Sequence, residues 1–138
     1  MKTKIEALAE FLNCETDEIL ESSYDSNTFE FGSQEYLVLT DEEADEKAKD
    51  YILDSIWAFN TEFIAGHTIA NFDERAIKSL RKMQGELCED ANELIKSMIN
   101  DLDHFVEDAI SCDGRGHFIS SYDGEENEQD EYFIYRTN

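Results

Sequence analysis

Residues 28–59 hold the pattern that most restricts the fold, because two different hydrophobic periods follow one another without a linker. The stretch "TFEFGSQEYLVL" (28–39) contains two alternating or apolar runs joined through Gly32 and Ser33, which predicts a β-hairpin. The next stretch, "TDEEADEKAKDYILDSIWAF" (40–59), has the spacing of an amphipathic helix. Thr40 and Glu43 form a capping box at its start. The chain therefore needs a fold in which helices pack against a sheet.

Further helices are predicted on both sides of this region. A short helix is expected over 3–13 behind a Thr3 cap, and the long helix should continue to about residue 65, where Gly66 stops it. A further helix is expected after this stop, capped by Asn71 or Asp73, and it should break or kink at Gly85. A third apolar pattern covers 87–110, and whether Asn100 interrupts it is left open.

The fold class follows from these faces. Strands are predicted at residues 28–31, 35–39, 116–121 and 131–136, with the acidic loop "YDGEENEQDE" joining the last two. Each hairpin and each amphipathic helix must bury its apolar face on another layer. We therefore expect one α+β domain over residues 1–138, with a small antiparallel sheet of about four strands in two hairpins, packed against three to five helices.

The charge of the chain excludes several partners. There are 34 acidic and 11 basic residues, for a net charge of −23, yet 41% of residues are hydrophobic, so a folded core is expected. No basic patch is present that could displace counterions from phosphates, which excludes direct binding of nucleic acid and of anionic membranes. No apolar run is long enough to span a bilayer, so a cytoplasmic location is expected.

A row of carboxylates is the strongest functional signal. Like charges four residues apart on a helix repel by about 0.2–0.5 kcal/mol per pair, so this row of three pairs destabilises its helix by about 1 kcal/mol. Four residues of helix rise about 6 Å, close to the separation of successive phosphates along a nucleic-acid strand. The residues of this acidic row are Glu42, Glu46, Asp50 and Asp54.

The acidic row allows two interpretations. A solvated acidic face can simply keep a protein soluble. Alternatively, the row imitates DNA or RNA and occupies the basic groove of a nucleic-acid-binding protein. The acidic loop between the last two predicted strands would extend such a surface if the fold brings it beside the helix. Its four carboxylates are Asp123, Glu125, Glu126 and Glu128.

Two segments, "YLVLTDEEADEKAKDYILDSIWAFN" and "DGRGHFISSYDGEENE", resemble stretches of small acidic proteins of bacteriophages and related mobile elements. In size, acidity and carboxylate rows the chain is also similar to phage DNA-mimic proteins that block restriction or CRISPR enzymes. The resemblance implies an anti-defence role in the host cytoplasm, with a basic nuclease or defence complex as partner. Alternatives are an immunity protein or antitoxin for a nuclease, and an interaction protein without mimicry.

Metal binding and catalysis have little support in the sequence. GxSxG, HExxH and phosphate-binding glycine motifs are missing, so we expect no enzyme, no cofactor and no metal. The acidic loop fails the EF-hand pattern, because Glu128 stands where glycine is needed and Ile134 where glutamate is needed. One mixed ligand set with helical spacing stays open as an alternative, namely Asp101, His104, Asp108 and Cys112.

Self-association is a further alternative. Residues 64–100 carry 6 acidic and 5 basic residues, so this stretch is nearly neutral. Because two strongly negative monomers repel, a homodimer would use this least charged surface, with Ile77, Leu80 and Met83 as its apolar face.

Overall fold

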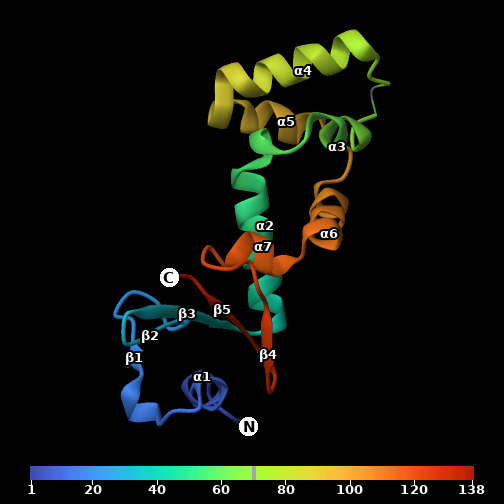
Figure 1. The fold of residues 1–138 in the computed structure, drawn as a ribbon. Coiled ribbons are helices and arrows are strands. Elements are labelled where there is room, and N and C mark those ends of the chain that lie inside the picture. Colours follow the sequence, from blue (N-terminus) through green and yellow to red (C-terminus); the bar gives the residue numbers. More distant parts are fainter. Residues whose placement is uncertain (70) are drawn as a thin grey trace. The chain divides into compact units, whose positions relative to one another are not determined.

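The computed structural model describes residues 1–69 and 71–138. The chain groups into two compact units (Figure 1). The sheet unit comprises residues 1–48 and 113–138, and the helical unit comprises residues 49–112. The boundaries fall within helix α2 (Asp41–Asp54) and at the end of helix α6 (Leu102–Asp113). The expectation of a single domain stays a prediction.

The sheet unit confirms the predicted α+β class. Its five strands are antiparallel in the order β1-β2-β3-β5-β4. The sheet contains two hairpins: β2–β3, as predicted, and β4–β5, whose first strand was not predicted; they join where Val38 lies opposite Ile134. The strands are β1 (Leu20–Glu21), β2 (Thr28–Phe31), β3 (Gln34–Leu39), β4 (Asn127–Gln129) and β5 (Tyr132–Arg136).

Helix α1 (Lys4–Leu12) contacts β3, β4 and β5 and closes the main core of this unit. Its N-terminus has the predicted cap, in which Thr3 and Glu6 form a capping box. Asn13 adopts the left-handed conformation and ends the helix. The buried cluster consists of Ala7, Leu8, Ala9, Ile19, Phe29, Tyr36, Val38, Tyr132 and Ile134.

The prediction of a strand at 116–121 is wrong. Residues Arg115–Ile119 form helix α7, and Ser120 N–H donates to the Gly116 carbonyl at 2.8 Å. A bond from residue i+4 back to residue i closes a helical turn, and the short apolar run at Phe118 and Ile119 cannot be assigned to helix or strand by periodicity alone. The hairpin partner of β5 is β4, which lies inside the segment expected to be a loop. Its residues are polar and show no apolar alternation, so the sequence pattern does not indicate a strand there.

Gly116 explains how α7 fits. A Cβ atom at this position would lie 2.4 Å from the Gly124 carbonyl oxygen, so only glycine allows the helix to approach the loop at 124–126 this closely. This contact places the loop next to α7.

The helical unit contains the greatest departure from expectation. The helix predicted to run to about residue 65 ends at Asp54, and the 3₁₀ turn η2 (Ile56–Ala58) and helix α3 (Thr61–Gly66) follow it. Asn92 accounts for the break, because its amide donates to the Asp54 carbonyl at 2.7 Å and its oxygen accepts from Trp57 N–H at 3.0 Å. A side chain distant in sequence thus takes over the backbone groups that helix continuation would need.

The remaining helices follow the sequence more closely. Helix α4 (Glu74–Leu87) is capped by Asp73, one of the two predicted capping residues. The predicted break at Gly85 is wrong, because the helix continues through this residue. The apolar pattern at 87–110 divides into the 3₁₀ turn η3 (Cys88–Ala91), helix α5 (Asn92–Met98) and α6, with Asn100 between the two helices.

The apolar face predicted for a homodimer is only partly exposed. Leu80 is buried, whereas Ile77 and Met83 are half-buried, and the homodimer stays a prediction. Over the residues described, no helix has the length and apolar character that crossing a membrane requires.

Candidate functional site

The predicted acidic row lies on α2, and all four of its side chains are exposed. Helix α2 contains seven acidic residues. Three of them are paired with cations: Glu43 with Lys4 at 2.6 Å, and Asp41 and Asp45 with Arg115. The other four are Glu42, Glu46, Asp50 and Asp54, and none has an ion pair with any residue that the structure describes. The fold thus neutralises three of the seven carboxylates of α2 and leaves the acidic row without a cationic partner among the described residues.

Arg115 links this helix to the acidic loop within the sheet unit. Its Nη1 donates to Oδ1 of Asp41 at 2.8 Å and to Oδ1 of Asp45 at 2.9 Å, and its Nε donates to Oε1 of Glu126 at 2.8 Å. The guanidinium also lies over the Phe133 ring, 4.6 Å from its centroid. Burial alone would lower the pKa of Arg115, but the hydrogen bonds to the three carboxylates outweigh it and raise that pKa.

The four loop carboxylates differ in their roles. Asp123 accepts from Ser120 Oγ at 2.9 Å and from Glu125 N–H at 3.0 Å, which holds the turn together. Glu126 accepts from Arg115 and from the Tyr135 hydroxyl, whose pKa is raised by burial and by this hydrogen bond. Glu125 and Glu128 are exposed without an ion pair to a described residue. The loop therefore does lie beside the start of α2, but only part of its charge faces solvent freely.

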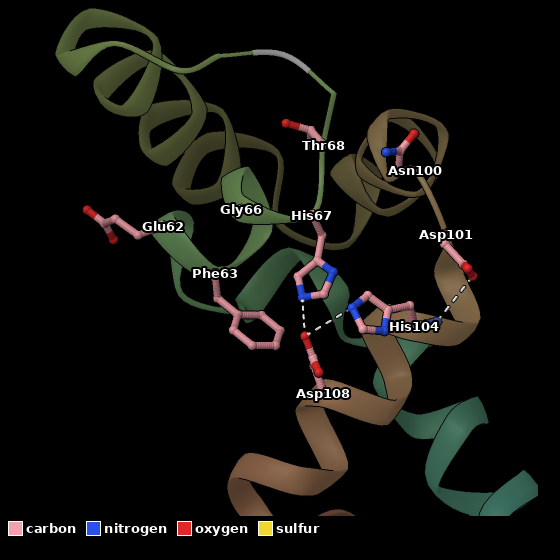
Figure 2. Close-up of a pocket in the computed structure, with 9 residues that line it drawn as sticks. All are labelled: Glu62, Phe63, Gly66, His67, Thr68, Asn100, Asp101, His104 and Asp108. Carbon is pink, nitrogen blue, oxygen red and sulfur yellow. Dashed lines mark hydrogen bonds and ion pairs between the residues drawn. The ribbon is translucent and has the colours of Figure 1, made fainter.

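A second cluster lies in a pocket of about 470 Å³ in the helical unit. Figure 2 shows His67 and His104, which come from different elements, turned towards Asp108. Nε2 of His67 is 3.1 Å from Oδ2 of Asp108, and Nε2 of His104 is 3.6 Å from the same oxygen. The side chain of His67 is 11% exposed, whereas that of His104 is 60% exposed. Two imidazoles thus converge on one carboxylate oxygen.

Local structure explains why these three groups meet. His104 and Asp108 are four residues apart on α6, so they share a face of that helix. Asp101 positions the start of α6, because its carboxylate accepts from His104 N–H at 3.2 Å. His67 ends α3, and its carbonyl accepts from Asn100 N–H at 2.9 Å, which joins the segment after α3 to the segment before α6.

The sequence pattern identified two of the three residues of this cluster. His104 and Asp108 belong to the helical ligand set considered above, but neither Asp101 nor Cys112 is part of the close group found among the described residues. His67 was missed because it has no periodic relation to α6 along the chain. Its only signal is scarcity, since the chain has just three histidines.

Comparison with known proteins adds no function to this geometry. Neither a protein-family model, nor a curated protein, nor a solved structure matches the chain.

Proposed function

We propose that the protein is an acidic inhibitor that occupies the nucleic-acid groove of a basic host-defence protein, such as a restriction or CRISPR nuclease. The observation that carries the proposal is the uncompensated acidic row on α2, beside three carboxylates of the same helix that have cationic partners. The row is the contact surface, and Glu125 and Glu128 add negative charge from the sheet unit.

The negative charge of the acidic row is complementary to the positive charge of a nucleic-acid groove. A groove that binds nucleic acid presents Lys and Arg at the spacing of phosphates, and a row of carboxylates with helical spacing can satisfy those cations. Long-range attraction between opposite net charges also speeds association. The protein acts in this proposal by occupation of the groove and needs no catalytic step.

An immunity protein or antitoxin for a nuclease would use the same charge complementarity. The two functions differ in the identity of the partner and in gene neighbourhood, because a toxin and its immunity protein are encoded side by side.

The test compares the wild type with a row-neutralised variant that carries Glu42→Gln, Glu46→Gln, Asp50→Asn and Asp54→Asn. Each immobilised protein is incubated with bacterial host lysate, and captured proteins are challenged with a short DNA duplex. We expect the wild type to retain a nucleic-acid-binding protein that the duplex displaces. Binding should weaken several-fold or more in the row-neutralised variant, and between about 50 and 200 mM salt in the wild type.

A matched variant changes the same number of charges elsewhere. Its substitutions fall on exposed carboxylates without an ion pair to a described residue, namely Asp17→Asn, Glu21→Gln, Glu89→Gln and Asp90→Asn. This variant should capture the partner nearly as well as the wild type. The row-neutralised variant should be folded and more stable by about 1 kcal/mol, because three repulsive pairs disappear. Equal capture by both variants, or capture that the duplex does not displace, would leave the acidic row as solubilising surface.

A further inference from the structure

We propose that His67, His104 and Asp108 bind one divalent transition-metal ion, Zn²⁺ in the first instance. This site lies in the helical unit and is independent of the acidic row.

The positions of the ligand atoms match the size of a metal site. With metal–ligand distances of about 2.0–2.2 Å, the ligands of a tetrahedral zinc ion are about 3.4 Å apart. The observed separations from Oδ2 of Asp108 are 3.1 Å to His67 and 3.6 Å to His104, one on either side of that value. All three ligand atoms lie within 4.8 Å of one another. Only a small closing movement of the two rings is needed.

The donor set selects the class of ion. Two imidazoles with one carboxylate suit Zn²⁺ and its first-row neighbours, whereas Ca²⁺ and Mg²⁺ prefer oxygen ligands alone. Three protein ligands leave at least one coordination position, which water from the pocket can fill. Glu62 does not supply a fourth ligand, because Arg81 Nη2 holds its carboxylate at 2.7 Å and Figure 2 shows it turned away from the cluster.

The site is held in place before an ion binds. The His67 ring packs against the rings of Phe63 and Phe105, with centroid distances of 5.0 and 5.1 Å. Asp101 caps the helix that carries the other two ligands. The packed rings restrict the His67 side chain, and the capped helix start restricts the backbone that carries His104 and Asp108. Contacts of this kind around the ligands tune metal affinity.

A simple ion pair is the competing explanation of the cluster. One histidine beside Asp108 would complete such a pair, but here a second histidine on the same helix is also directed at the same oxygen. The metal site accounts for all three groups, and the two explanations differ in what happens when Zn²⁺ is added.

The experiment titrates the full chain, first treated with a chelator, with Zn²⁺ by calorimetry and with Co²⁺ by visible absorption. We expect one saturable equivalent of Zn²⁺ that displaces Co²⁺. The Co²⁺ spectrum should show four- or five-coordinate d–d bands without a thiolate charge-transfer band, which excludes the cysteines as ligands.

The ligand variants are His104→Gln and Asp108→Asn, and the matched controls are His117→Gln and Glu107→Gln, both at exposed positions. Loss of a ligand should lower affinity for the single equivalent by at least about 10- to 100-fold, whereas the controls should bind as the wild type does. Because the side chain of His104 is 60% exposed, His104→Gln should remain folded, which circular dichroism checks. Absence of saturable one-to-one binding, or equal binding by the ligand and control variants, would overturn the proposal.

Discussion

At the scale of single residues, a few side chains determine where negative charge is neutralised. Lys4 donates to Glu43 at 2.6 Å and also to the side chain of Asn27, which ties α1, the segment before β2 and the start of α2 together. Burial raises the pKa of Glu43, but the hydrogen bonds from Lys4 and Thr40 outweigh it and hold that pKa below its ordinary value of 4.5.

Glu43→Gln should therefore lower the free energy of unfolding at neutral pH by about 1 kcal/mol, a small value because Glu43 is partly exposed. A carboxylate with a lowered folded-state pKa contributes its full stability above the unfolded-state pKa and loses it as the pH falls through the folded-state value. The difference between variant and wild type should thus persist from pH 7 to about 5 and shrink below about 4.5. Urea unfolding at several pH values measures it, with Glu42→Gln as a control at an unpaired position. A difference that is the same at pH 7 and at pH 3.5 would contradict the assignment.

At the scale of elements, the interruption between α2 and α3 depends on side chains from other helices. Gln84, on α4, is buried and donates to the carbonyls of Trp57 and Phe59, both at 2.7 Å. Its own oxygen accepts from Thr61 Oγ1 at 2.7 Å. One amide therefore satisfies two carbonyls of the segment that links α2 and α3 and the hydroxyl of the first residue of α3.

Gln84→Leu should lower the free energy of unfolding by about 1–3 kcal/mol, because the replacement fills the space but leaves two partly buried carbonyls without their donor. Urea denaturation gives the magnitude, and faster hydrogen exchange at residues 55–61 would locate the effect. Met83→Leu, a change of similar volume at the adjacent half-buried position, should cost less than about 1.5 kcal/mol. If both substitutions have equal effects, the hydrogen bonds of Gln84 contribute little.

At the scale of the whole molecule, the basic residues are largely used in internal ion pairs. Seven of the 11 basic side chains pair with carboxylates in the part of the chain that the structure describes, namely Lys2, Lys4, Lys49, Arg81, Lys82, Lys96 and Arg115. The unpaired charge is consequently almost all negative, and it opposes the compact state by self-repulsion.

Added NaCl should therefore raise the melting temperature, because the Debye length falls from about 30 Å at 0.01 M to about 3 Å at 1 M ionic strength. Surface ion pairs also weaken with salt, but each contributes only about 0–1 kcal/mol, so repulsion should dominate. Thermal unfolding followed by circular dichroism checks the direction. The row-neutralised variant has four fewer negative charges and should gain less from salt. A melting temperature that falls with added NaCl would show that the ion pairs dominate.

Interactions between near neighbours were determined by the sequence alone. The capping boxes of Thr3 with Glu6 and Thr40 with Glu43, and the hairpin around Gly32, depend on residues a few positions apart, so their patterns are visible in the chain. Tertiary structure decided the rest. Asn92 ends α2 and His67 reaches a cluster on α6, each through partners far apart in sequence, and Gly116 lets α7 pack against the loop at 124–126. Local propensity leaves such choices open, because burial and hydrogen bonding with distant groups outweigh the small differences between one local conformation and another.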